Sequence, residues 1–166
     1  MTDTHQKAGV RAARGGRARP VRHAHTVSPE ILARSRALEA PVVALFNQHR
    51  AVLGLPPLTA DPKLAEVAAA HSADMLQRGY FAHDDAHGTW DARIRRAVTR
   101  SEVGEILSFG SGEYATPAGM VKSWMQSREH RSIILTADLR RVGLGVATGT
   151  FEGQDAVSLA TADFSS

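Results

Sequence analysis

Three separate segments of the chain carry residue types that bind metals or move protons near neutral pH. The first is the loop of residues 81–88, in which His83 and His87 accompany Asp84 and Asp85. Two imidazoles and two carboxylates could supply the nitrogen and oxygen ligands that Zn²⁺ takes in proteins. Surface loops also collect such residues without binding anything. A zinc site in this loop is therefore one hypothesis, and an ordinary polar loop is the alternative.

The other two segments each offer one ionisable side chain beside apolar neighbours. Glu105 alternates with apolar residues, and a carboxylate on an apolar face must be paired, hydrogen-bonded, metal-bound or protonated. An exposed edge position is the alternative for Glu105. His130 follows an apolar helical stretch, where a helix C-terminus would also favour a histidine. His49 and His71 lie on apolar helical faces, which is typical of hydrogen-bonded core histidines.

The composition is that of one ordinary globular domain. Of the 166 residues, 43% are hydrophobic and 22% are charged. No run approaches the roughly 18 consecutive apolar residues of a membrane-spanning helix. The chain has no cysteine, which excludes disulfides, thiolate metal sites and a cysteine nucleophile.

Positive charge is concentrated near the N-terminus. Residues 1–40 hold eight Lys or Arg against three acids, a net charge of +5, and the rest of the chain has a net charge of −2. We assign residues 1–36 to a basic, disordered tail and residues 37–166 to the folded domain. The arginines of the tail could bind a polyanion by counterion release, or the tail could be a solvated linker. No apolar segment of about 7 to 15 residues follows the arginines, so no signal peptide is visible.

The hydrophobic periodicity predicts helices that precede and separate a few strands. Ser28 and Pro29 are typical of a helix start, and Pro41 is expected to interrupt or restart that helix. An apolar stripe that includes His49 then continues to Gly54. Because there is no βαβ alternation, the predicted class is α+β with a small antiparallel sheet. The other expected elements are helices at 61–79, at 90–97 and from 116, a strand at 103–109, and a hairpin of 142–151 and 156–164.

Several motifs resemble one known family in their order and spacing. Val103-Gly104-Glu105 is similar to the start of a Gly-Glu-Asn signature, and Trp124-Met125-x-Ser127-x-x-His130-Arg131 is similar to a Trp-Met-x-Ser-x-Gly-His-Arg signature. Both signatures belong to the CAP superfamily, in its bacterial SCP-like extracellular branch, and the resemblance covers about 125 residues up to Phe164. Other matching segments are Phe46-Asn47-Gln48-His49-Arg50, Gly54-Leu55-Pro56-Pro57-Leu58, His71-Ser72-x-Asp74-Met75, Phe81-Ala82-His83 and Val142-Gly143-Leu144-Gly145-Val146.

This resemblance implies an α-β-α sandwich, with helices flanking the sheet, and a cleft lined by two histidines and two acids. His83, Glu105 and His130 fall on three of the four cleft positions, and Ser127 falls on the fourth. It also implies that His83 and His130 hold a divalent cation such as Zn²⁺, and that the protein is extracellular or associated with the cell wall.

The chain departs from the family pattern near this cleft. Ile106 stands where the signature has Asn, Ile133 where bacterial members often have Asn, and Glu129 where the signature has Gly. The two isoleucines remove side chains that both donate and accept hydrogen bonds, so the polar network of the cleft must differ from the usual one. Glu129 is a second candidate for the missing carboxylate.

Three functions are consistent with these features. The first is a binding module that takes a small apolar or wall-derived ligand, with metal at His83 and His130. The second is a metal-assisted hydrolase in which Glu105 or Glu129 acts as the base. The third is an adhesion protein that acts through its basic tail while the cleft is vestigial. The second lacks support from any Gly-x-Ser-x-Gly, His-Glu-x-x-His or Gly-rich phosphate motif.

Overall fold

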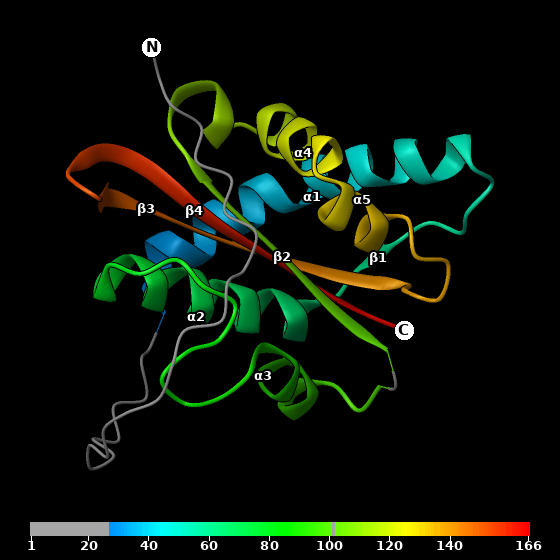
Figure 1. Ribbon diagram of the computed structural model, residues 1–166, viewed down its shortest axis with the longest axis horizontal. Helices are drawn as coiled ribbons and strands as arrows, with labels where there is room; N and C mark the ends of the chain where they lie inside the picture. The colour runs from blue at the N-terminus through cyan, green and yellow to red at the C-terminus, as the bar shows by residue number, and fades with distance from the viewer. Residues whose placement is uncertain (1–26, 101) are drawn as a thin grey trace.

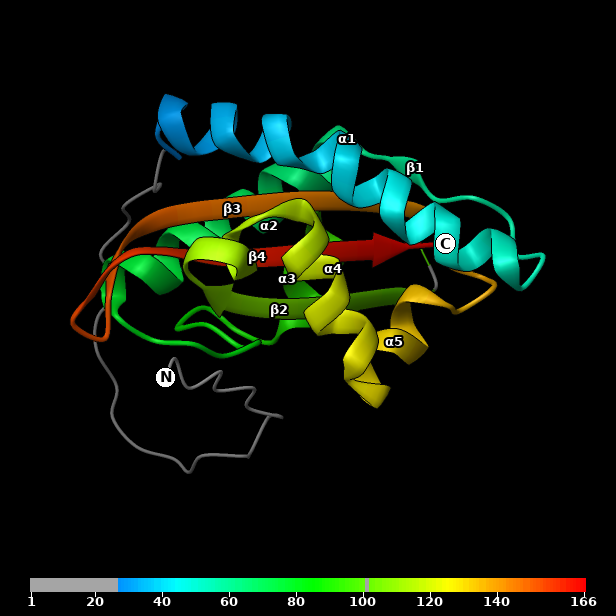
Figure 2. The same ribbon diagram turned by 90° about the horizontal axis from the view of Figure 1, so that it is seen from above.

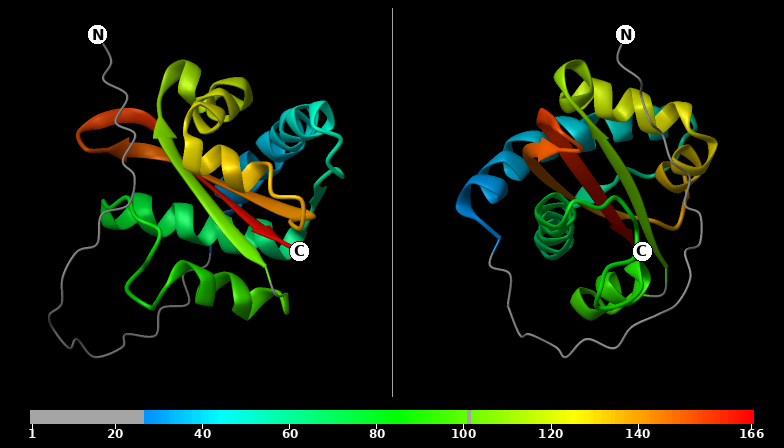
Figure 3. Two further views of the ribbon diagram at one scale, coloured as in Figure 1. Left: turned by 45° about the vertical axis from the view of Figure 1, so that its right-hand side comes forward. Right: turned by 60° about the vertical axis from the view of Figure 1, so that its left-hand side comes forward.

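The computed structural model of the chain describes residues 27–100 and 102–166. Four strands form one sheet in the order β1-β3-β4-β2. The three long strands pair antiparallel, whereas the two-residue β1 pairs parallel with β3. β2 lies at the edge of the sheet, between α3 and the α4–α5 pair (Figure 3). The bounds are β1 Thr59–Ala60, β2 Val103–Gly110, β3 Arg141–Phe151 and β4 Gln154–Ser165.

Helices cover both faces of the sheet. α1, α4 and α5 lie on one face, and α2 and α3 lie on the other (Figures 1 and 2). The predicted α+β class and the α-β-α sandwich are therefore confirmed. No helix in the described ranges combines the length and the apolar character needed to cross a membrane. The bounds are α1 Pro29–Val52, α2 Pro62–Arg78, α3 Trp90–Ala97, α4 Pro117–Gln126 and α5 Arg128–Ile134, with a 3₁₀ turn at Gly112–Ala115.

Alternation along the strands builds two cores from one sheet. Ile106 of β2 points into the larger core, together with Phe46 of α1 and Trp124 of α4. Leu107, the next residue, points to the opposite face and packs with Met75 of α2. Because successive side chains of a strand alternate between faces, Glu105 shares the α2 and α3 side with Leu107.

The first helix departs from two expectations drawn from the sequence. α1 runs without a break through Pro41. Proline cannot donate the helical hydrogen bond, and burial of Val42 and Phe46 against the sheet offsets the free energy lost with that bond. It begins at Pro29, capped by Ser28, so it starts inside the range 1–36 that we assigned to the tail. Residues 1–26 of that tail lie outside the described residues.

The predicted apolar stripe of α1 is wrong at its C-terminal end. His49 is exposed, and Val52 and Leu53 are 84% and 59% exposed. The buried residue is instead Arg50, which has no exposed surface. Its guanidinium donates to the carbonyls of Pro56, Ile134, Thr136 and Leu139 at 2.7–3.0 Å. A cation therefore occupies the position where the periodicity predicted apolar packing, because four loop and helix-end carbonyls converge there and need donors.

Candidate functional site

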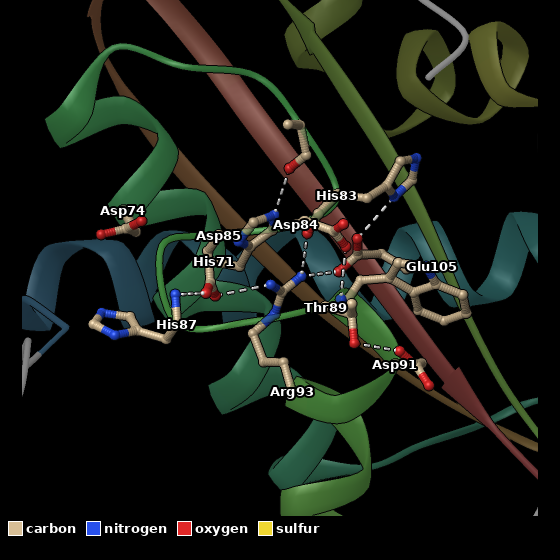
Figure 4. Close-up of polar contacts among 12 residues, drawn as sticks. His71, Asp74, His83, Asp84, Asp85, His87, Thr89, Asp91, Arg93 and Glu105 are labelled. Atoms are coloured by element: carbon tan, nitrogen blue, oxygen red, sulfur yellow. Dashed lines mark hydrogen bonds and ion pairs between the residues drawn. The ribbon is translucent and has the colours of Figure 1, made fainter. Parts of the chain in front are cut away.

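Glu105 is the centre of a buried polar cluster on β2 (Figure 4). Its side chain has no exposed surface, and each of its oxygens has a different partner. Oε1 lies 2.8 Å from Nδ1 of His83, and Oε2 accepts a short hydrogen bond from the guanidinium of Arg93. Burial opposes ionisation, but the hydrogen bond from His83 and the positive charge of Arg93 outweigh it and hold the pKa of Glu105 below its usual value. Glu105 is therefore a buried carboxylate.

The state of Glu105 defines the tautomer of His83. An ionised carboxylate can only accept, so Nδ1 of His83 must carry the hydrogen that lies between them. The ring is 36% exposed, and its Nε2 points away from Glu105 in Figure 4. In its neutral form, His83 would therefore present the lone pair of Nε2 on the accessible side of the cluster.

Arg93 of α3 ties the loop of residues 81–88 to the sheet. Besides Glu105, its guanidinium binds the Asp85 carboxylate at 3.0 Å and the His83 carbonyl at 3.0 Å. Its side chain is only 11% exposed. Arg93 therefore holds the backbone of His83 next to Glu105, the carboxylate that the His83 ring contacts.

The two aspartates of the loop accept hydrogen bonds from nearby backbone amides. Asp84 accepts from the amide of Trp90 at the start of α3, and Asp85 accepts from the amide of His87. His87 is exposed. Within residues 27–100 and 102–166, no three His, Asp or Glu side chains are grouped so that they could hold a metal ion. The hypothesis of a four-ligand zinc site made by this loop is therefore wrong.

His71 holds the residue that precedes His83. It is 2% exposed, and its Nε2 lies 2.9 Å from the Ala82 carbonyl, which makes Nε2 the donor. Burial lowers the pKa of His71, so the ring is neutral. The expectation of a hydrogen-bonded core histidine is confirmed, and its hydrogen bond steadies the loop next to His83.

His130 lies in α5, in the layer on the other face of the sheet from α2 and α3. Ser127 caps α5 by accepting from the His130 amide at 3.4 Å, so its role in the structure is to begin the helix that carries His130. Burial and the charge of His83 lower the pKa of His130. Its Nδ1 is buried and has no hydrogen-bond partner among the described residues. Glu129, the alternative carboxylate, is exposed beside it.

The departures from the family pattern pack as apolar residues. Ile106 is fully buried in the core with Trp124, on the face of β2 opposite Glu105. Ile133 packs at the edge of the same core, close to Gly104. Both positions therefore strengthen packing under α4 and α5 and add no polar group to the site.

Two residues of the cluster were missed from the sequence. Arg93 was included only in a short basic helix, where nothing distinguishes it from its neighbours. Asp163 lies directly opposite Glu105 in β4 and is completely buried. Burial, the charge of Glu105 and a side-chain hydrogen bond with Glu105 raise the pKa of Asp163 well above its usual value. An acid inside the run of apolar and small residues at 156–165 was the signal that could have identified it.

Known proteins with similar sequences carry the family pattern that the motifs of this chain resemble. The family model described as "CAP: Cysteine-rich secretory protein family" matches residues 43–159. In Bacillus subtilis (strain 168), "Uncharacterized protein YkwD" is 35% identical over 111 residues, which are 66% of this chain and 42% of that protein. "Uncharacterized membrane protein YlbC" of the same organism is 32% identical over 110 residues, 65% of this chain and 31% of that protein. The chain therefore spans less than half the length of these two relatives.

A solved structure shows the same architecture. It is the crystal structure of an extracellular protein containing a SCP domain from Bacillus anthracis str. Ames, with a TM-score of 0.69 and 25% identity. The match covers 86% of this chain and 45% of that one.

Proposed function

The chain belongs to the CAP family, the cysteine-rich secretory protein family, and from that premise we propose that it is a binding module of an extracellular protein. Its ligand site is formed by the imidazoles of His83 and His130, which hold a divalent cation such as Zn²⁺. A small apolar or wall-derived ligand would bind over the same two rings. This CAP domain contains no cysteine, so its stability rests on packing and on buried polar clusters.

One observation carries the proposal: the hydrogen bond from Nδ1 of His83 to a carboxylate that Arg93 also holds. Metal-binding histidines commonly donate their second ring hydrogen to a carboxylate, which orients the ring and makes the free nitrogen a better ligand. The lowered pKa of His130 keeps that second imidazole neutral near pH 7, as metal binding requires. The donor set therefore fits a cation that takes two protein nitrogens.

Two protein ligands support modest affinity. The described residues offer no third His, Asp or Glu grouped with them, so solvent or a bound ligand would have to complete the coordination. When bound, the cation would supply a positive charge that attracts an electron-rich group of the ligand. Glu105 orients the His83 ring, and burial holds the pKa of His130 below its usual value.

The engagement of Glu105 favours binding over hydrolysis. A general base needs a lone pair within reach of the proton that it takes. The side chain of Glu105 has no exposed surface, so its lone pairs lie out of reach of a ligand in the accessible part of the site. Glu129 is exposed and has no hydrogen-bond partner among the described residues to place it. We therefore assign Glu105 the role of a positioning residue.

The extracellular or wall-associated location is part of the proposal. It is supported by the Bacillus anthracis structure, which is that of an extracellular protein. Binding of a polyanion by the arginines of the tail stays a prediction, because residues 1–26 lie outside the described residues.

Calorimetric titration of the full chain with Zn²⁺ tests the proposal. We expect one site near pH 7 that is lost in His83→Ala and in His130→Ala and retained in His87→Ala, the matched control from the same loop. A triple variant, His5→Ala with His23→Ala and His25→Ala, separates this site from the histidines near the N-terminus. Binding that survives both site substitutions, or no binding at all, would overturn the metal assignment.

A further inference from the structure

A second pocket lies on the α2 and α3 side of the sheet and shares no residue with the histidine site. It has a volume of about 500 Å³ and is bounded by the start of α2, the turn after α3 and the start of β3. α2 and α3 cover the same face of the sheet, as Figure 1 shows. Three cations from these segments, Lys63, Arg100 and Arg141, line the pocket.

Only one of the three cations is neutralised locally. Arg141 pairs with Asp61 at 3.2 Å, and its side chain is still 44% exposed. Lys63 and Arg100 are exposed, and neither side chain forms an ion pair or hydrogen bond with another described residue. With Asp61 as the single lining acid, the three cations leave the pocket with a net charge of +2.

The backbone amides at the start of α2 do not supply the positive charge of the pocket. Oδ1 of Asp61 already accepts from the amides of Lys63 and Leu64, so those donors are occupied. The charge comes from side chains that converge from three segments distant in the sequence. Ala97 and Val98 add an apolar wall, and Val98 is 8% exposed.

We propose that this pocket binds a phosphate group, as the dianion of a phosphate monoester or of free phosphate. A dianion would balance the net charge of +2, and the planar guanidinium of Arg100 suits two oxygens of one phosphate. Lys63, at the start of α2, supplies a second, compact charge. The apolar wall accommodates the carbon skeleton of a phosphorylated small molecule, so the monoester binds more tightly than the free ion.

Titration followed by ¹H–¹⁵N NMR tests this assignment on the full chain. The probes are inorganic phosphate and glycerol 3-phosphate at pH 7.5, with chloride at equal ionic strength as the reference. We expect saturable shifts at the amides of Thr99 and Arg100. Arg100→Ala and Lys63→Ala should each weaken binding by about fivefold, in line with one charge contact at an exposed site. Binding should also weaken at pH 5.5, because the second pKa of a phosphate monoester is near 6.

Arg96→Ala is the matched control. Arg96 is exposed on α3 and does not line the pocket, so its substitution removes the same charge from outside the site. Its affinity should stay within about twofold of the wild type. Tighter binding of glycerol 3-phosphate identifies an organic monoester, and equal binding identifies the phosphate group alone as the ligand. The absence of saturable shifts, or an equal loss in Arg96→Ala and Arg100→Ala, would overturn the proposal.

Discussion

Glu105 and Asp163 lie directly opposite each other in β2 and β4, and both carboxyl groups are buried. They differ in their partners: Glu105 is held by Arg93 and His83, whereas the partner of the Asp163 carboxyl is Glu105 itself. Two adjacent buried carboxyls cannot both be ionised cheaply. The hydrogen bond from His83 and the charge of Arg93 hold the pKa of Glu105 below its usual value, and burial with the charge of Glu105 raises that of Asp163. The pair therefore consists of one carboxylate and one neutral acid.

Asp163→Asn should change how stability depends on pH. The pKa of Asp163 in the folded state lies above its unfolded value, so ionisation costs nothing below about pH 4. The cost grows as pH rises from the unfolded pKa toward the folded one, by about 1.4 kcal/mol per pH unit. Asn does not ionise, so the variant should gain stability relative to the wild type between pH 4 and pH 7.

Urea unfolding at several pH values measures this gain. Asp138→Asn, at an exposed position, is the control and should show no comparable trend. A difference between Asp163→Asn and wild type that is independent of pH would contradict a raised pKa of Asp163.

Arg93→Met should destabilise the fold. It leaves Glu105 and Asp85 without their shared cation, and Glu105 is fully buried. Breaking a buried ion pair by removing one partner costs about 3 kcal/mol or more. Arg96→Met removes an exposed charge from the same helix and should cost less than about 0.5 kcal/mol. Chemical denaturation measures both variants. Equal losses of unfolding free energy would show that the ion pairs of Arg93 add nothing to stability.

Glu105→Gln should weaken Zn²⁺ binding at the proposed site. Gln keeps the shape but removes the charge that orients His83 and raises its ligand strength. Loss of such a partner lowers metal affinity by about 10- to 100-fold. Asp91→Asn, on the exposed part of α3, should leave the affinity unchanged. Calorimetry decides the matter, and an unchanged affinity in Glu105→Gln would remove Glu105 from the site.

Arg50→Met should cost about 3 kcal/mol or more of unfolding free energy. The substitution fills part of the volume but leaves the carbonyls of Pro56, Ile134, Thr136 and Leu139 without their donor. Arg140→Met, at an exposed position, serves as the control for charge. Thermal or urea unfolding should separate the two variants clearly, and similar midpoints would contradict a structural role for Arg50.

Gly145→Ala should prevent or severely impair folding, whereas Gly149→Ala in the same strand should be tolerated. A Cβ at Gly145 would fall on the backbone of Ala68 and Ala69 in α2, which cannot move aside. At Gly149 it would meet only the side chain of Leu76, at 3.1 Å. Soluble yield and unfolding midpoint test the contrast, which depends on how closely α2 lies against β3.

The outline of the fold could be predicted from the sequence because its signals are local. Asp61 with Pro62 and the left-handed Gly79 mark the two ends of α2, and the structure has both. The hairpin of β3 and β4 likewise follows from two alternating runs around a polar turn. The family motifs identified the CAP domain, which the family model confirms.

The errors have tertiary causes. Pro41 lies inside a continuous helix because burial of its neighbours outweighs a local preference. Arg50 is buried because four carbonyls from distant segments meet around it, which no periodicity in α1 indicates.

By itself the sequence determined the order of the elements, the CAP motifs and the ionisable residues His83, Glu105 and His130. Only the tertiary structure decided which of these groups are charged and which partners they have. Arg93 and Asp163 come from α3 and β4, and they reach Glu105 only when the sheet and its helices assemble. Proton affinity depends on burial and on nearby charges, and both are properties of the assembled fold.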